Sequence, residues 1–163
     1  MKSVIGIDPG SKQSGYVQWT GKEILAKGIH PNEDILELLA YGWCGGPPKN
    51  TVLAIESMIT IPGGADKAVI QTIEWADRFY QAWQGEKAKV PVGDVRVALC
   101  GTMRSDNADV RRVLIQRFGE PGTKKNPNPI TYGLKGSGYH LIRAFAVAVV
   151  HLDHLEFQGR ILK

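Results

Sequence analysis

The fold prediction rests on the stretch SVIGIDPG, residues 3–10 of the chain. Val4, Ile5 and Ile7 form an apolar run typical of a strand buried on both faces, and the Pro-Gly pair that follows predicts a turn. Asp8 is therefore expected at the carboxyl end of a buried strand, which is where functional side chains collect in α/β proteins.

Four more strand-like segments and four helical segments follow this first strand. Strand-like runs of apolar residues occupy 15–19, 23–29, 51–56 and 95–99. Amphipathic spacing predicts helices over 32–43, 66–84, 105–118 and 138–157. Short turns separate the first three strands, whereas helices separate the later ones. This order predicts an α/β domain with a mixed five-stranded sheet flanked by helices, antiparallel first and parallel afterwards.

The composition favours a single domain spanning residues 1–163. That length buries an adequate core without disulfides, and a hydrophobic fraction of 43% argues against disorder. Cys44 and Cys100 form no zinc-type pattern and are expected to be reduced thiols. Because no apolar run approaches ~20 residues and residues 1–8 read as a strand rather than a signal peptide, we expect a cytoplasmic protein without membrane contact.

Positive charge is concentrated in the second half of the chain. The net charge of +4 indicates a mild preference for a polyanionic partner. The stretch 120–129, rich in Pro, Gly and Lys, is expected to be the most mobile loop. Any single basic residue here is more typical of a solvated surface than of a binding site. Those that could contact a DNA backbone are Arg104, Arg111, Arg112, Lys124, Lys125 and Lys135.

Asp8 and Glu56 are the leading candidates for chemistry, because each ends a buried strand. If these two strands are neighbours, about 4.8 Å apart, the two carboxylates lie side by side and can share a divalent ion. Taken alone, Asp8 is as well explained by turn chemistry. The occurrence of two such residues at two strand ends favours a site. His140, at the start of the last helical segment, is a third candidate.

Two apolar features suggest roles in DNA or subunit contacts. The loop 57–64 carries apolar residues that could part DNA bases as a wedge or, equally, pack against the domain or a second subunit; they are Met58, Ile59 and Ile61. The helical segment 66–84 shows more than one apolar face, which suits a dimer interface. Its aromatic residues are Trp75, Phe79, Tyr80 and Trp83.

Three segments resemble motifs of RuvC-type Holliday junction resolvases. IGIDPGSKQSGYV (5–17) resembles the family's opening strand and turn, LAIESM (53–58) its second acidic strand, and GYHLIRAFAVAVVHL (138–152) its closing helix. The basic segment 100–119 is similar to the family's helix after the third crossover. The resemblance implies a ribonuclease-H-like fold, a homodimer, Mg²⁺ or Mn²⁺ without a small-molecule cofactor, and paired nicks across a four-way DNA junction. The compact, solitary design matches that of a phage-encoded resolvase.

The resemblance assigns Asp8, Glu56 and His140 to metal-ligand positions and places Arg143 where many relatives have an acidic ligand. A guanidinium cannot ligate a cation. Arg143 could pair with Asp8 or Glu56 and displace a metal, or it could hold the scissile phosphate. The site could then use one ion, use two with fewer ligands, or be impaired. The preferred hypothesis is an active nuclease in which these four residues are catalytic.

Three rival functions remain to be distinguished. One is a junction-binding protein of the same fold whose cleavage is impaired by Arg143. Another is a nuclease of this fold that acts on flaps or RNA–DNA hybrids. Actin-like phosphotransferases share the Asp-x-Gly turn, but they need two such domains and a nucleotide cleft, for which this chain is too short.

Overall fold

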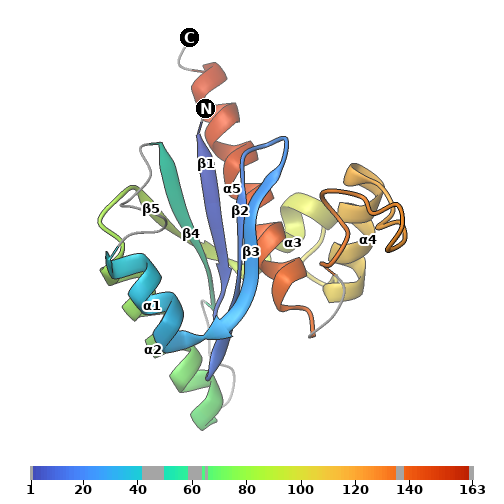
Figure 1. Cartoon of the computed structure of the whole chain (residues 1–163). Helices are drawn as coiled ribbons and strands as arrows, with labels where there is room; N and C mark the ends of the chain where they lie inside the picture. The colour runs from blue at the N-terminus through green and yellow to red at the C-terminus, as the bar shows by residue number, and fades with distance from the viewer. Residues whose placement is uncertain (1, 42–49, 59–63, 65, 135–137, 162–163) are drawn as a thin grey trace.

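The computed structural model describes residues 2–41, 50–58, 64, 66–134 and 138–161, and it forms a sheet with helices on both faces (Figure 1). The strands are β1 (Ser3–Asp8), β2 (Gln13–Trp19), β3 (Ile24–Pro31), β4 (Thr51–Ser57) and β5 (Lys87–Pro91). The helices are α1 (Asn32–Tyr41), α2 (Lys67–Ala82), α3 (Val92–Cys100), α4 (Asn107–Phe118) and α5 (His140–Ile161).

The sheet is mixed, with five strands in the order β3-β2-β1-β4-β5. β1 pairs antiparallel with β2 and parallel with β4, while β2–β3 is antiparallel and β4–β5 is parallel. This arrangement confirms the predicted sheet. The register of β1 and β4 sets Ile7 opposite Ile55. Asp8 and Glu56, one residue further on, therefore lie side by side at the carboxyl ends of two central strands.

The fifth strand lies earlier in the chain than the sequence indicates. The strand predicted over 95–99 is wrong, because these residues belong to α3, which ends at Gly101 in the left-handed conformation (φ 76°). Val95 is buried while Val97 is 47% exposed, which fits a helix turning one face inward. The true strand, β5, is an edge strand that carries Lys87 and Lys89. Lysines on an edge strand discourage pairing with a strand of another molecule. They also interrupt the apolar pattern by which a strand is recognised in a sequence.

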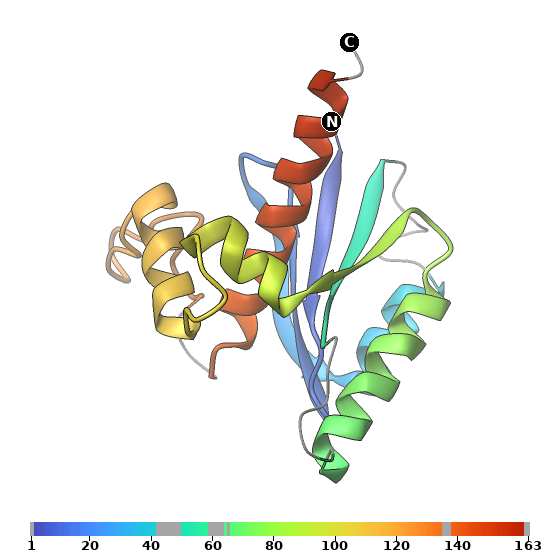
Figure 2. The same ribbon diagram turned by 180° about the vertical axis from the view of Figure 1, so that it is seen from behind.

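Two apolar layers cover the sheet, with α1 and α2 packed on one face and α5 on the other (Figures 1 and 2). Side chains alternate between these layers along β1: Ile5 and Ile7 pack with α1 and α2, whereas Val4 packs with α5. A period of two residues places Asp8 on the same face as Val4. The acidic end of β1 is thus directed to the side of the sheet that α5 covers.

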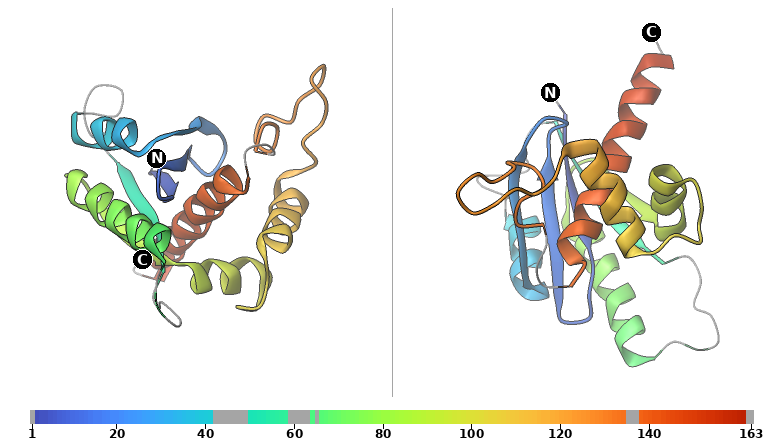
Figure 3. Two further views of the ribbon diagram at one scale, coloured as in Figure 1. Left: turned by 90° about the horizontal axis from the view of Figure 1, so that it is seen from below. Right: turned by 90° about the vertical axis from the view of Figure 1, so that its right-hand side faces the viewer.

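Helix α5 lies very close to β1 and β2 because both strands have a glycine beneath it. A Cβ atom at Gly6 would lie 2.1 Å from the carbonyl oxygen of Ala144, and one at Gly15 would lie 2.7 Å from that of His140. Only glycine allows so close an approach. The view from below in Figure 3 shows α5 between the sheet and α4. None of the described helices, α5 included, has the length and apolarity needed to cross a bilayer.

The aromatic residues of α2 pack mainly into the core. Phe79 and Trp83 are 0% and 1% exposed, and Trp75 lies 5.7 Å from Phe79 between ring centroids. The expectation that Phe79 and Trp83 contribute to a dimer interface is therefore wrong, because a partner could not reach them. Ile70, which is 46% exposed, is the large apolar residue that α2 presents to solvent.

The first half of the connection between α4 and α5 is held by hydrogen bonds back to the end of α4. Asn128 donates a hydrogen bond to the carbonyl of Phe118 and accepts one from the backbone of Ile130, while Thr131 donates to the carbonyl of Gly119 at 2.8 Å. These bonds hold residues 128–131 against the end of α4, so the stretch 120–127 forms a closed loop between them. The mobility expected for residues 120–129 stays a prediction.

A buried network of polar side chains fixes the turn that follows Asp8. Ser14 donates to the Asn32 side-chain oxygen at 2.6 Å, and the Asn32 amide donates to the carbonyl of Gly10 at 2.9 Å. The backbone N–H of Gly10 in turn donates to Ser14 Oγ at 3.1 Å. Asn32 and Ser14 are both completely buried, so water does not compete for these bonds.

Replacing Asn32 with Ala should therefore lower the free energy of unfolding by about 1–3 kcal/mol, because it leaves buried donors and acceptors without partners. Urea denaturation measures the change. Glu37→Ala on the exposed side of α1 is the control, with an expected change within about 0.5 kcal/mol. Equal losses in the two variants would contradict the role assigned to the network.

Candidate active site

Four side chains from three elements meet at the carboxyl end of β1. Asp8 ends β1, Glu56 lies near the end of β4, and His140 and Arg143 belong to the first turn of α5. Asp8 Oδ2 lies 2.6 Å from His140 Nδ1, and Asp8 Oδ1 lies 3.3 Å from Arg143 Nε. Arg143 Nη2 donates to Glu56 Oε2. The structure thus brings together all four residues that the sequence singles out, although they come from distant parts of the chain.

Burial disfavours the ionised form of the Glu56 carboxyl group. Desolvation, followed by repulsion from Asp8, raises the pKa of Glu56 to about 8, because these effects outweigh the attraction of Arg143. Two buried carboxyl groups this close favour a bound cation, since added positive charge stabilises their ionised form.

The two basic residues respond to the same carboxylates. The hydrogen bond that the His140 imidazole donates to Asp8 raises the pKa of His140, although burial and Arg143 oppose this shift. Burial disfavours the charged form of Arg143, but attraction to Asp8 and Glu56 outweighs it and raises the pKa of the guanidinium. Arg143 therefore remains a permanent positive charge beside the carboxylates.

The raised pKa of Glu56 gives the metal-free protein a defined pH dependence. The folded state keeps a proton that the unfolded chain releases between about 4.5 and about 8, so stability falls as pH rises through this window. Glu56→Gln removes this titration. Between pH 5 and pH 8 the wild type should lose at least about 1 kcal/mol more unfolding free energy than the variant. Urea denaturation in EDTA at both pH values tests this, and parallel losses would contradict it.

The donor set fits a divalent cation. Carboxylate oxygens and imidazole are ligands of Mg²⁺ or Mn²⁺ in proteins. Asp8 Oδ1 is the one buried side-chain oxygen or nitrogen among the described residues that lacks a hydrogen-bond partner, which is the state that a bound cation would relieve. No three His, Cys, Asp or Glu side chains in the described ranges form a ready-made metal cage, and the guanidinium of Arg143 lies against both carboxylates. An ion at Asp8, Glu56 and His140 would therefore have to share this space with Arg143.

A cleft of about 160 Å³ opens beside Glu56 and Arg143. Met58, 44% exposed, lines this cleft together with Glu56, whereas the other wedge candidates, Ile59 and Ile61, lie outside the described residues. Lys89 also lines this cleft and forms an ion pair with Asp77. Sequence reasoning counts Lys89 only as one of the basic residues in the second half of the chain and does not place it at the site, because the strand that carries it is not recognisable from its pattern.

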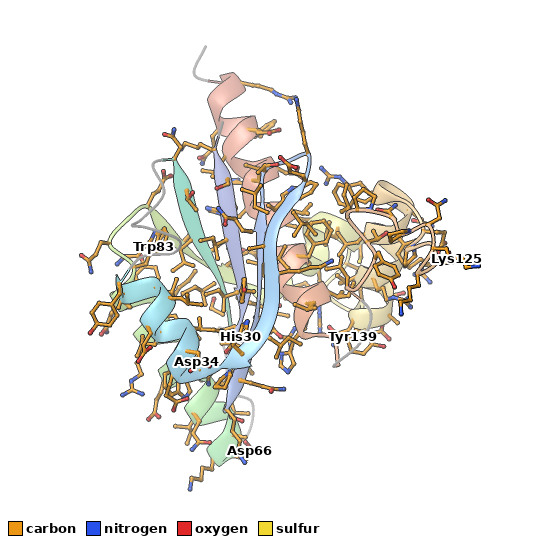
Figure 4. All side chains as sticks on the ribbon, viewed as in Figure 1. His30, Asp34, Asp66, Trp83, Lys125 and Tyr139 are labelled. Atoms are coloured by element: carbon orange, nitrogen blue, oxygen red, sulfur yellow. The ribbon has the colours of Figure 1, made fainter. Side chains whose placement is uncertain are left out.

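The basic residues expected to grip DNA lie outside the cleft. Arg104 is exposed between α3 and α4, Arg112 is exposed on α4, and Arg111 is half-buried there. Lys124 and Lys125 are exposed on the loop after α4, and Figure 4 shows Lys125 at the edge of the molecule furthest from α1. Lys135 lies outside the described residues.

A larger cavity of about 590 Å³ lies towards the other end of α5. It is mainly apolar and includes Leu99, Val150 and Phe157 in its walls. His151 also borders it, with a pKa lowered first by burial and then by His154. None of the four clustered residues lines this cavity, so it is separate from the candidate active site.

The fold matches solved structures across nearly the whole chain. The structure of Thermus thermophilus RuvC has a TM-score of 0.63 and 15% sequence identity, covering 96% of each chain. T. thermophilus RuvC in complex with a Holliday junction substrate has a TM-score of 0.65, again at 15% identity, covering 97% of each chain. No protein-family model and no curated protein matches the sequence. At this identity the likeness establishes the fold, and it confirms the expected RuvC-type, ribonuclease-H-like architecture.

Proposed function

We propose that this chain, which has the fold of RuvC, is an endonuclease that cuts branched DNA, above all four-way junctions, by metal-dependent hydrolysis. The observation that carries the proposal is the convergence of four side chains at the carboxyl ends of the two central strands: Asp8, Glu56, His140 and Arg143. The structural neighbour solved with a Holliday junction substrate supports the choice of DNA.

Each residue of the cluster has a task in phosphodiester hydrolysis. Mg²⁺ or Mn²⁺, held by Asp8, Glu56 and His140, would supply water activation and charge neutralisation when bound. Asp8 orients the His140 ring through the bond to Nδ1. In its neutral form His140 can also accept a proton near neutral pH. Arg143 offers a fixed positive charge for a phosphate oxygen.

The grip on DNA comes from surfaces around the cluster. Arg104, Lys124 and Lys125 are exposed and free to contact phosphates, and Met58 on the cleft wall is placed to press between bases. A homodimer would present two such sites across a twofold axis, which matches the symmetry of a four-way junction. The proposed setting is the cytoplasm.

Nicking of synthetic DNA tests the proposal. A labelled four-way junction, a flap, an RNA–DNA hybrid and a linear duplex are each incubated with the protein and Mg²⁺ or Mn²⁺. Paired nicks in the junction, abolished by EDTA, are expected. Preferred cutting of the flap or hybrid would point to another nuclease of this fold. Junction binding without cuts, rescued by Arg143→Asp, would favour a cleavage-impaired binder.

Lys124→Ala and Lys125→Ala should each weaken junction binding and flatten its salt dependence. A lysine that contacts a phosphate releases about one counterion, so the slope of log affinity against log salt should fall by about 1 in each variant. Fluorescence anisotropy over a salt series measures it. Lys22→Ala, at the exposed turn between β2 and β3, makes the same charge change and should leave the slope unaltered. If all three variants show the same slope, the loop that carries Lys124 and Lys125 does not belong to the DNA-binding surface.

A further inference from the structure

Arg143 bridges the two carboxyl groups of the cluster. Its Nη2 donates to Glu56 and its Nε lies 3.3 Å from Asp8 Oδ1, so one guanidinium touches both acids. The side chain of Asp8 is 0% exposed and that of Glu56 is 5% exposed, whereas that of Arg143 is 31% exposed. The positive charge therefore occupies the space where a cation shared by these acids would otherwise lie.

The charge of the cluster sets how many cations it can hold. Once a bound cation has brought both carboxyl groups into their ionised form, they carry two negative charges, and Arg143 supplies one positive charge that cannot be lost by deprotonation. One divalent ion then leaves a single excess positive charge to meet a phosphate. A second divalent ion would be placed beside both the first ion and the guanidinium, in surroundings of low polarity where repulsion is strong.

The position of Arg143 follows from the way its helix is held. Gly6 and Gly15 seat α5 directly on β1 and β2, which fixes the backbone of its first turn. The N–H of Arg143 also donates to the carbonyl of Tyr139 at 2.9 Å, in the turn seen at the foot of α5 in Figure 4. Asp8 Oδ1 nevertheless has no hydrogen bond, so Arg143 does not satisfy the carboxylates completely. A single further cation could bind this oxygen and complete the neutralisation.

We infer that Arg143 is a built-in counter-ion that replaces one metal ion, so that the site binds a single divalent cation. The inference rests on the metal dependence in the proposed function. It concerns ion binding, however, and ion binding can be measured without DNA.

Titration with Mn²⁺, followed by the electron paramagnetic resonance signal of the free ion, tests the inference on the whole chain. The wild type should bind one Mn²⁺ per chain. Arg143→Met removes the charge at similar length, and it should bind the first ion at least about 10-fold more tightly and accept a second. Arg160→Met is the matched control: it makes the same change on the exposed end of α5 and should behave as the wild type.

Circular dichroism shows whether the neutral variant folds. If it does not, Arg143→Lys, which keeps the positive charge, still tests the inference. It should bind one ion, and a second ion in this variant would overturn the inference. Two ions in the wild type, or unchanged binding in a folded Arg143→Met, would do the same. Junction nicking by the wild type in the same buffer separates the two proposals: cuts accompanied by two bound ions refute only the counter-ion, whereas no bound Mn²⁺ and no cuts refute both.

Discussion

Replacing Asp8 with Asn is expected to lower the rate of junction cleavage by at least about 10³-fold, because groups that act as one catalytic unit fail together when one of them is lost. Asp8 contacts both His140 and Arg143, and its buried Oδ1 has no hydrogen bond. Asn keeps the size of the side chain but removes its charge. A cation would lose a central ligand, and the His140 ring would lose its anionic partner.

Single-turnover cleavage of a labelled junction measures this loss, and anisotropy in EDTA measures binding. Binding should stay within about threefold, because most of the proposed phosphate contacts lie on other surfaces. Asp153→Asn is the matched control. Asp153 lies on the same helix as His140 and pairs with Arg117 on the surface, 2.5 Å away. A cleavage rate in Asp8→Asn close to that of this control would exclude the cluster as the catalytic centre.

Gly6→Ala is expected to lower the free energy of unfolding by about 3 kcal/mol or more. The new methyl group would lie 2.1 Å from the carbonyl oxygen of Ala144 and 2.9 Å from the Cβ of Ala148, so either the strand or α5 must move. Overpacking of this kind usually costs about 1–3 kcal/mol, and contact with rigid backbone lies at the upper end. Movement of α5 would also carry His140 and Arg143 away from Asp8, so cleavage should fall as well.

Urea denaturation compares this variant with Gly159→Ala. Gly159 lies in the same helix, and a Cβ there meets nothing within 4 Å. Its replacement should stabilise the protein by up to about 1 kcal/mol, because Ala is the better helix former. If Gly6→Ala unfolds at the same urea concentration as the wild type, α5 can shift without a loss of stability. The close packing of α5 on β1 would then not be what positions the site residues.

The central sheet and the meeting of the two acids could be predicted because local signals specify them. The apolar run before Asp8 and the one before Glu56 each mark a buried strand, and the chain order makes these strands neighbours. The parallel register then brings their ends together. His140 could be placed only through a resemblance, because no local pattern links the first residue of α5 to β1.

What could not be predicted depends on contacts across the molecule. Val95 and Val97 are two positions apart, a spacing that suits a strand as well as a helix. Only the packing of this segment against α5 decides between the two. Phe79 and Trp83 look like an exposed aromatic face until the sheet covers them. Whether the side chain of Arg143 turns towards the acids or towards solvent depends on where α5 packs on the sheet, and the sequence alone does not show this position.

The separation of Asp8 and His140 by 132 positions has a consequence for the timing of synthesis. A ribosome that adds about 5–20 residues per second needs roughly 7 to 26 s to travel from one to the other. During that interval the nascent chain carries a carboxylate without its imidazole and arginine neighbours. In the proposed nuclease, the site is therefore incomplete until α5 has been synthesised and has packed against the sheet, and a chain that stops before this helix would lack His140 and Arg143.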